Sequence, residues 1–305
     1  MYIQSILIPC VALFLLDFVC ADTIQQTRFM VTKGHKLSQG TQLKRINSTN
    51  ISLALCASIC TSECGSATFS VRHKTCITFR DKFYNFSMIW TQDPDWLVLF
   101  RDEAIQYGGW TLVFRAQNHI NVSMYHTWTN NGQHDDNPLT SSSLNGCYRL
   151  DNLGGCKKHF RSSILDSWTA VKKVKLSVYV NGSEVNYIEF QGASTSRETW
   201  FKQALISNSS WSNIMTDSSV NYFSLQGYAQ GGHARRFIIF GGHGTCSLET
   251  TYFLAVDQAS DDCLENWKVP AGSYPIFIAS RAKGMIQISL RDYALADVMA
   301  VFVKF

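Results

Sequence analysis

The chain has 305 residues, of which 46% are hydrophobic and 16% are charged, with a formal net charge of +4. The positive charge is small and scattered, which argues against nucleic acid as a partner, and no run of 18 or more apolar residues predicts a membrane span.

The first 21 residues are typical of a secretory signal peptide. Residues 6–16 form an uninterrupted apolar run, and Val19 and Ala21 supply small side chains before Asp22. This pattern predicts cleavage after Ala21. The alternative is an uncleaved membrane anchor, but the run is too short to span a bilayer. We therefore expect a secreted, extracellular protein, in which removal of Asp17 raises the formal charge from +4 to +5.

Cysteine usage agrees with secretion. Beyond the signal peptide eight cysteines remain, an even number that favours four disulfides in an oxidising compartment. Zinc is the alternative, because cysteines four residues apart can be ligands, yet no second cluster has zinc-finger spacing. The predicted bonds are Cys56–Cys76, Cys60–Cys64, Cys147–Cys156 and Cys246–Cys263.

Six Asn-x-Ser/Thr sequons add a further extracellular feature. Such sequons are acceptors for N-glycosylation and are then expected on the surface. Their asparagines are Asn47, Asn50, Asn85, Asn121, Asn181 and Asn208.

Residues 22–101 are expected to form a small first domain, with one helix lying on an antiparallel sheet. Asn50 or Ser52 can cap a helix over residues 53–60, in which Cys56 and Cys60 lie one turn apart on the same face. Strands are predicted at residues 67–71, 75–79 and 96–100. The bond from Cys56 to Cys76 would then tie the helix to the sheet.

This first domain resembles the PAN/apple module. The resemblance rests on Cys56-x3-Cys60-x3-Cys64, on the strand at 67–70 and on Cys76-Ile77-Thr78, and it covers roughly residues 40–101. It implies one helix pinned across an antiparallel sheet by the disulfide pairing given above. Modules of this family bind proteins or carbohydrates, so extracellular proteins or glycans are the expected partners.

Residues 108–305 are expected to form a larger, mostly antiparallel β domain. Asn181-Gly182 between two alternating runs is a strong hairpin signal, because both turn positions need a positive φ. One helix is predicted over 197–206, where Thr195 and Glu198 form a capping box. The predicted strands are 110–115, 174–180, 185–190, 223–228, 237–240, 252–256, 276–279, 286–290 and 298–305.

The second domain resembles fibrinogen-related domains. It opens with Gly108-Gly109-Trp110-Thr111, and Phe253-x3-Asp257 followed by Asp261-Asp262-Cys263 is similar to the family's calcium loop and late disulfide. A later Gly-Gly-Trp and an Asn-Leu-Asn-Gly segment are missing, so the resemblance is to a divergent invertebrate form. An apple module followed by such a domain resembles a type of coral skeletal organic matrix protein.

Calcium is the one ion that the sequence suggests, and no other cofactor is expected. Asp257, Asp261 and Asp262 offer the hard oxygen ligands that calcium prefers. Ala259 stands where a further carboxylate is expected, so the alternatives are a weak site or none, with three solvated carboxylates in a surface loop.

Other polar groups give no catalytic pattern. His233 and His243 follow paired glycines, and we interpret them as turn residues rather than as ligands in a loop face. The chain has no Gly-x-Ser-x-Gly elbow, no His-Glu-x-x-His motif and no phosphate-binding Gly-Lys-Ser/Thr loop. We predict no catalytic residues and therefore a protein that is not an enzyme. Trp211, in a run of polar residues, is the tryptophan expected to be exposed.

These features predict a secreted extracellular matrix component of a skeletal (biomineral) organic matrix, which works through protein and carbohydrate contacts. The low acidic content argues against direct mineral binding by an acidic surface. The alternative is a soluble lectin-like recognition or adhesion protein that uses the Gly-rich loops of the second domain.

Overall fold

The computed structural model describes residues 2–3, 29–39, 42–60, 64, 66–80, 89–101, 105–136, 147–151, 153, 156–230, 233–242, 245–259 and 261–305. The chain divides into two compact units, residues 1–103 and 104–305. This division falls between the two predicted domains, residues 22–101 and 108–305. The predicted cleavage site after Ala21 lies outside the described residues.

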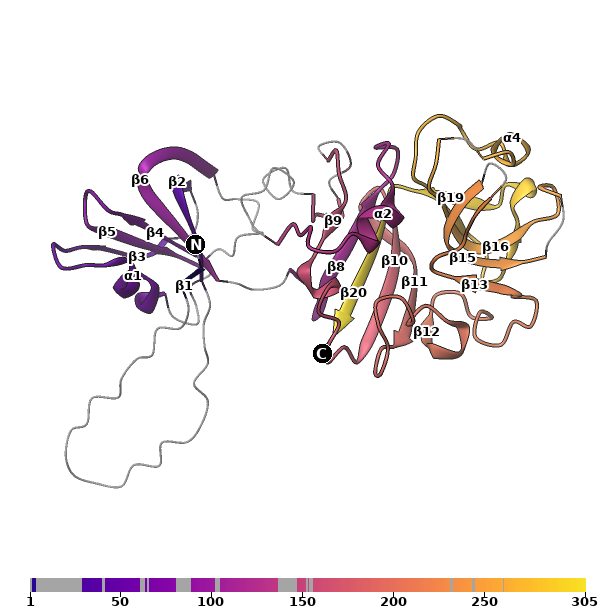
Figure 1. Cartoon of the computed structure of the whole chain (residues 1–305), viewed down its shortest axis with the longest axis horizontal. Coiled ribbons are helices and arrows are strands. Elements are labelled where there is room, and N and C mark those ends of the chain that lie inside the picture. Colours follow the sequence, from indigo (N-terminus) through magenta and orange to yellow (C-terminus); the bar gives the residue numbers. More distant parts are fainter. Residues whose placement is uncertain are drawn as a thin grey trace, which may run out of the picture. The chain divides into compact units, whose positions relative to one another are not determined.

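Unit 1 is built on one antiparallel sheet with the strand order β1-β2-β6-β4-β5-β3 (Figure 1). β1 lies within the predicted signal peptide, so cleavage there would remove it. The strands are β1 (Tyr2–Ile3), β2 (Phe29–Gln39), β3 (Gln42–Asn47), β4 (Ser66–Ser70), β5 (Thr75–Phe79) and β6 (Ile89–Arg101).

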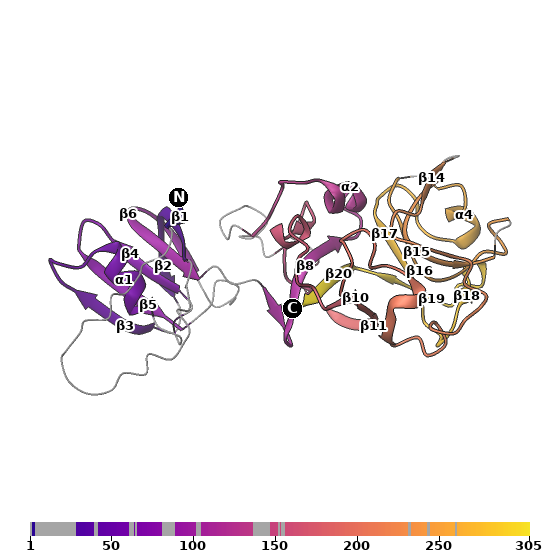
Figure 2. The ribbon, with the colours of Figure 1, turned by 60° about the horizontal axis from the view of Figure 1, so that its bottom comes forward.

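Helix α1 (Leu53–Ile59) lies across β4 and β5, as Figure 2 shows. Ser52 is its N-cap, with Oγ accepting a hydrogen bond from the backbone N–H of Leu55 at 3.1 Å. The helix buries Cys56 against Phe69, and the predicted Cys56–Cys76 disulfide ties it to β5. The Cys60–Cys64 disulfide follows the helix, so both predicted bonds of this unit are confirmed.

Unit 2 contains two antiparallel sheets. The first has the order β12-β11-β10-β20-β8-β7, with β9 also paired to β8. Its Asn181-Gly182 turn joins β10 to β11 with φ values of 50° and 77°, as the hairpin prediction requires. The strands are β7 (Gln106–Tyr107), β8 (Trp110–Gln117), β9 (Phe160–Arg161), β10 (Lys173–Val180), β11 (Ser183–Gln191), β12 (Ile206–Ser209) and β20 (Val298–Lys304).

The second sheet has the order β13-β15-β16-β17-β19, with β14 paired to β15 and β18 paired to β16. The described part of the unit also contains the short helices α2 (Met124–Thr129) and α4 (Leu264–Trp267) and the 3-10 turns Ser163–Leu165, Gln203–Leu205 and Ile288–Leu290. The strands are β13 (Tyr222–Ser224), β14 (Tyr228–Gln230), β15 (His233–Gly241), β16 (Thr250–Val256), β17 (Ile276–Ser280), β18 (Ile286–Gln287) and β19 (Tyr293–Ala296).

The second sheet is buried on both faces because its strands alternate between two cores. Phe237 and Ile239 join the main core, which they share with the first sheet and with Trp128 of α2. Ile238 and Phe240 point the other way, into a smaller core under α4. Figure 1 shows the two sheets of this unit, with α4 beyond the second. The mostly antiparallel β fold class is confirmed.

Three sequence predictions about unit 2 were wrong. Residues 197–205 contain a turn and the short 3-10 segment, and Ile206 begins β12, because Trp200 and Phe201 both enter the core. Thr195 Oγ1 donates to the carbonyl of Gly192 at 2.7 Å instead of capping a helix. Trp211 is only 1% exposed, and its Nε1 donates to the carbonyl of Ser280 at 3.1 Å.

Two predicted strands are interrupted. The strand expected over 223–228 is split into β13 and β14 by a turn in which Gly227 has φ of 60°. The strand expected over 286–290 ends after Gln287, where the chain enters the 3-10 turn Ile288–Leu290.

Candidate functional site: a buried arginine beneath the loops of the second sheet

Arg235 is the centre of a polar network at one end of the second sheet. Its side chain is fully buried, and its Nε and Nη2 each donate to one oxygen of Asp261 at 2.8 Å. Nη1 donates to Oε1 of Glu249 at 2.9 Å and to the hydroxyl of Tyr228 at 2.6 Å. The guanidinium also lies over the ring of Trp267, 4.5 Å from the centroid. One cation thus joins β15, the loop before β16, the 257–263 loop and α4.

The strand itself explains why Arg235 is buried and its neighbour is not. Successive side chains of a strand point to opposite faces, so Arg235 points toward α4 while Arg236 points toward α2. Arg236 is half-buried and lies 4.4 Å from the ring centroid of Tyr125. A bulge follows, at which Phe237 has φ of 47° and the register with β16 shifts.

Charge pairing holds the network in its ionised form. Burial disfavours a charged guanidinium, but the hydrogen bond and charge of Asp261, together with the charge of Glu249, raise the pKa of Arg235 above its usual range. Burial also works against ionisation of Asp261, yet the hydrogen bonds and charge of Arg235 lower the pKa of that carboxyl. Burial raises the pKa of Tyr228 to about 12, so its hydroxyl stays protonated.

His233 lies at the edge of this network and is 24% exposed. Its Nδ1 is 3.1 Å from Oδ1 of Asp261 and 3.3 Å from Nη2 of Arg235. A protonated Nδ1 donates to the carboxylate, whereas an unprotonated one accepts from the guanidinium. The second predicted loop histidine, His243, lies outside the described residues.

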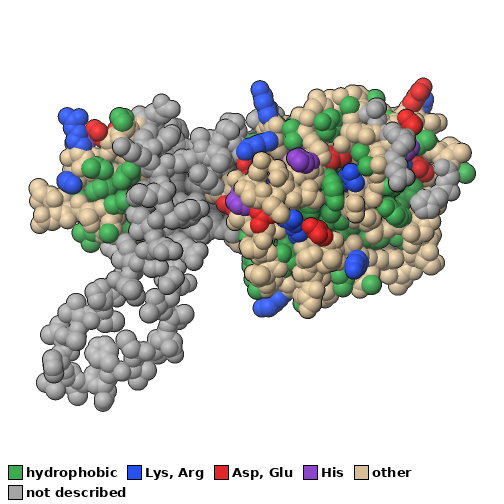
Figure 3. Space-filling model, viewed as in Figure 1, with side chains coloured by type: hydrophobic (Ala, Val, Ile, Leu, Met, Phe, Trp, Pro, Cys, Tyr) green, Lys and Arg blue, Asp and Glu red, His purple; other side chains and the backbone are tan. Residues whose placement is uncertain are grey.

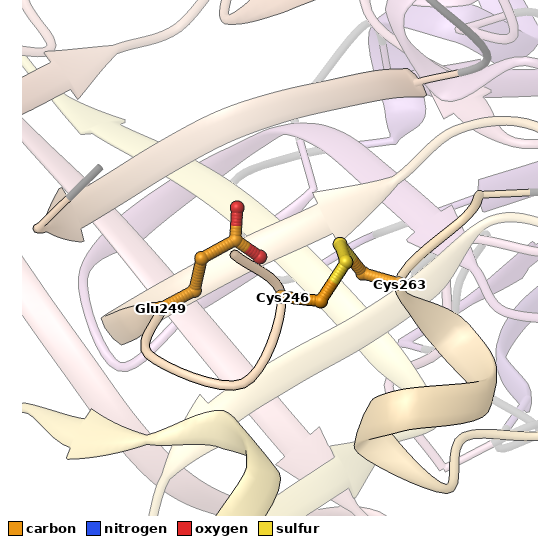
Figure 4. A group of neighbouring side chains, drawn as sticks. All are labelled: Cys246, Glu249 and Cys263. Carbon is orange, nitrogen blue, oxygen red and sulfur yellow. A yellow bond between two sulfur atoms is a disulfide. The ribbon is translucent and has the colours of Figure 1, made fainter. Parts of the chain in front are cut away.

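A disulfide and a carboxylate lie together beside the arginine. Cys246 is bonded to Cys263, the N-cap residue of α4, and one carboxylate oxygen of Glu249 lies within 4.8 Å of both sulfurs (Figure 4). This is the group of potential metal ligands that the described part of the chain brings together. Because the sulfurs are bonded to each other, neither is the thiolate that a metal requires. The bond instead ties the 245–249 loop to α4.

Asp257, the first of the predicted calcium ligands, is used as a helix cap. Its Oδ2 accepts from Ser123 Oγ at 2.6 Å and from the backbone N–H of Tyr125 at 3.0 Å. Its Oδ1 accepts from the N–H of Met124 at 2.8 Å. Burial raises the pKa of Asp257, and these hydrogen bonds oppose that shift. The carboxylate satisfies the free N–H groups at the start of α2.

The structure does not bring the three predicted calcium ligands together. Asp257 caps α2, Asp261 pairs with Arg235, and Asp262 is exposed. The two buried carboxylates direct their oxygens at protein donors. A calcium ion in this loop would have to displace those donors.

The sequon asparagines lie where an attached glycan has room. Asn47, Asn50, Asn121, Asn181 and Asn208 are all exposed, and Asn85 lies outside the described residues. The remaining predicted disulfide, Cys147–Cys156, is present, and each of the four bonds lies within one unit.

Charged side chains of both signs are scattered over the face of unit 2 shown in Figure 3. Among the described residues, no helix has the length and apolar content needed to cross a membrane. A scan against protein-family models gives no match, and a search of curated proteins gives no similar sequence.

Sequence reasoning missed the central residue of this site. In the sequence, Arg235 is simply the first of two adjacent arginines in the strand His233–Gly241. A charged side chain that points into a core needs a partner, but the sequence does not show which residue that is. Its acidic partners, Glu249 and Asp261, lie 14 and 26 residues further along the chain. No local pattern connects them.

Proposed function

We propose that the chain is a secreted component of an extracellular matrix, of the skeletal organic matrix type, which acts by binding rather than by catalysis. Its partners in this proposal are extracellular proteins and glycans. The observation that carries the proposal is a loop surface formed by residues 245–249 and 287–290. Hydrogen bonds, the Arg235 network and the Cys246–Cys263 disulfide hold this surface in place, and it exposes the side chains of Leu248 and Leu290 to solvent. A rigid surface loses less conformational entropy when it binds a partner.

The rigid support is the Arg235 network together with the Cys246–Cys263 disulfide. The loop that contains Leu248 is joined to the segment before Leu290, because the carbonyl of Ser247 accepts from Ser289 Oγ at 2.7 Å and from Gln287 Nε2 at 2.6 Å. A backbone hydrogen bond from Ile288 to Glu249 adds to this connection.

Two leucines stand on these joined segments. Leu248 is 64% exposed and Leu290 is 72% exposed, the highest values among the large hydrophobic side chains of the described residues. Exposed apolar groups on a supported surface favour contact with another protein. The disulfides and the exposed sequons suit an extracellular location.

The proposed identity of the two units follows the resemblances in their sequences. A helix tied to an antiparallel sheet by Cys56–Cys76 supports a PAN/apple module in unit 1. The opening strand that begins at Trp110 and the Cys246–Cys263 bond support a divergent fibrinogen-related domain in unit 2. Both families work by binding, which agrees with the proposed function.

The experiment uses the full chain, secreted from eukaryotic cells and incubated with washed, demineralised skeletal matrix. We expect the chain to be retained, and we expect Leu248→Lys/Leu290→Lys to reduce retention. The matched control is Val185→Lys/Met215→Lys, which changes two other exposed apolar residues, 41% and 50% exposed. Equal retention of both pairs would refute the proposed surface. Tight sugar-specific binding on a glycan array, without retention by the matrix, would favour the lectin alternative.

A further inference from the structure

The net positive charge of the chain belongs to its first domain. Residues 22–101 contain ten lysines and arginines against five aspartates and glutamates, whereas residues 102–305 contain seventeen of each. The first domain therefore has a formal charge of +5, and residues 102–305 are formally neutral. Such a charge difference between two parts of one chain favours an anionic partner for the basic part.

The charges of the two units also differ in how they are paired. In unit 2, ion pairs compensate several of the cations, among them Lys158–Asp135, Lys175–Glu184 and Arg197–Asp166. In the described part of unit 1, Arg72 lies 3.5 Å from Asp95, and its side chain is 74% exposed. Lysine and arginine side chains stand out on the described surface of that unit (Figure 3).

The cations of unit 1 follow one edge of its sheet. β3 is the last strand of the sheet, and it pairs with β5 from Gln42 opposite Phe79 to Asn47 opposite Thr75. At about 3.4 Å per residue, the positions before and after β5 are roughly 20 Å apart. Five exposed cations lie on β3 or just beyond the ends of β5, and we call them the basic edge: Lys44, Arg45, Arg72, Lys74 and Arg80.

The sheet fixes the positions of these cations before any ligand binds. Neighbouring side chains of a strand point to opposite faces. Ile46, which is paired with Cys76, packs against the core beneath α1, so Lys44 lies on that face and Arg45 on the other. The Cys56–Cys76 disulfide holds β5 against the helix. A ligand that lies along β3 therefore meets cations on both sides of a preformed edge, which lowers the entropic cost of binding.

The cations of the basic edge are open to an external anion. Among the described residues, Lys44, Arg45, Lys74 and Arg80 form no ion pair with a carboxylate, and Arg72 shares only the exposed contact with Asp95. Guanidinium and ammonium groups bind sulfate and carboxylate oxygens through charge-assisted hydrogen bonds.

The shape of the edge favours a linear polyanion over a folded acidic protein. A sulfated polysaccharide is an extended chain that carries sulfate and carboxylate groups at short intervals. Leu55 on α1 and Val71 are the exposed large hydrophobic side chains of the described part of unit 1, at 47% and 51%. A folded protein would thus find little apolar surface to bury beside the basic edge, and buried apolar groups carry much of protein–protein affinity.

We propose that the basic edge of unit 1 binds a sulfated glycan of the extracellular matrix. This inference rests on the proposed function and names the class of glycan. It gives the two units different tasks, with the sulfated glycan bound by unit 1 and the protein contact made by Leu248 and Leu290 of unit 2.

The test measures binding of the full secreted chain to immobilised heparin, the probe for a sulfated glycan, at increasing sodium chloride. Binding should weaken steeply with salt, because release of counterions drives the association of cations with a polyanion. Lys44→Gln/Arg45→Gln should weaken binding about tenfold at physiological salt, since each exposed ion pair contributes a factor of up to about five. Arg72→Gln/Lys74→Gln, at the other end of the edge, should also weaken it.

The matched control is Lys172→Gln/Lys173→Gln, which removes the same charge from two exposed lysines of unit 2. This control should bind heparin as the parent does. Heparin without its sulfates and polyglutamate, an acidic polypeptide, should both bind much more weakly than heparin. Equal melting temperatures of the parent and the three double variants exclude misfolding, which exposed substitutions rarely cause.

The proposal is overturned if Lys172→Gln/Lys173→Gln weakens binding as much as Lys44→Gln/Arg45→Gln, because binding then follows net charge alone. Polyglutamate that binds as tightly as heparin would overturn it in favour of an acidic protein partner. A chain that ignores heparin but is retained by demineralised matrix overturns this proposal and leaves the proposed function intact. A chain that binds heparin but is not retained by the matrix overturns the proposed function instead.

Discussion

Substitution of Arg235 by methionine is the strongest test of how the loop surface is supported. The change removes the cation and keeps a side chain of similar length. It leaves Asp261, whose side chain is fully buried, and Glu249, which is 10% exposed, without their shared partner. Removing one member of a buried ion pair typically costs about 3–5 kcal/mol, because an uncompensated charge remains.

For a unit of this size, that loss corresponds to a fall in melting temperature of roughly 6–20 °C. The assay is thermal and urea unfolding of the full chain, followed by tryptophan fluorescence. The fluorescence of Trp267 reports directly on the network, since its ring lies against the guanidinium of Arg235. The triple variant Arg235→Met/Asp261→Asn/Glu249→Gln removes the stranded charges and should recover a large part of the loss.

The matched control is Arg236→Met, on the next residue of the same strand. Arg236 is half-buried, stacks on Tyr125 and donates to the carbonyl of Gln226. Its charge acts on the carboxylate of Asp257, but the two groups form no direct ion pair, so its loss should cost about 1 kcal/mol or less. If Arg235→Met and Arg236→Met lose the same free energy of unfolding, the network does not support the loops.

Three further changes test other contacts. Burial lowers the pKa of His159 to about 4 from 6.5, so the stability that its neutral form contributes is complete above pH 6.5 and falls by about 3 kcal/mol on acidification to pH 4. His159→Gln should flatten that part of the pH profile of unfolding, and an unchanged slope would assign it to other groups. Asp257→Ala should cost about 2–3 kcal/mol by uncapping α2, equally with calcium or chelator. A calcium-dependent rise in melting temperature that vanishes in this variant would restore the calcium prediction. Cys246→Ser/Cys263→Ser should lose about 3 kcal/mol, and a much smaller loss would show that Arg235 alone holds the loop.

Local patterns predicted the parts of the fold that depend on neighbouring residues. The turn at Asn181-Gly182 needs two positive φ values, and few residue pairs supply them. Helix α1 followed from Ser52 and from cysteines spaced one turn apart. The strand Thr75–Phe79 and all four disulfides were also predicted correctly.

The failures arise where tertiary contacts override local preference. Thr195 and Glu198 have the spacing of a capping box, but burial of Trp200 and Phe201 in the main core outweighs helix formation there. Trp211 lies in a polar run, yet the unit folds it against Tyr252, with 5.8 Å between ring centroids.

The candidate site was hidden for the same reason. Asp257 meets α2 across more than 130 residues of sequence, so a carboxylate that looked like an ion ligand is in fact a helix cap. Arg235 finds both of its carboxylate partners only when β15, β16 and the loop before α4 come together. The residue types were visible in the sequence, but the distances between them were not.

Mass spectrometry of washed, demineralised skeletal matrix tests the central claim most directly. The proposed function predicts peptides of this chain in that material, with Asp22 as the first residue and glycans on exposed sequons such as Asn181. Recovery of the chain only from inside cells, with residues 1–21 attached and the sequons unmodified, would contradict it.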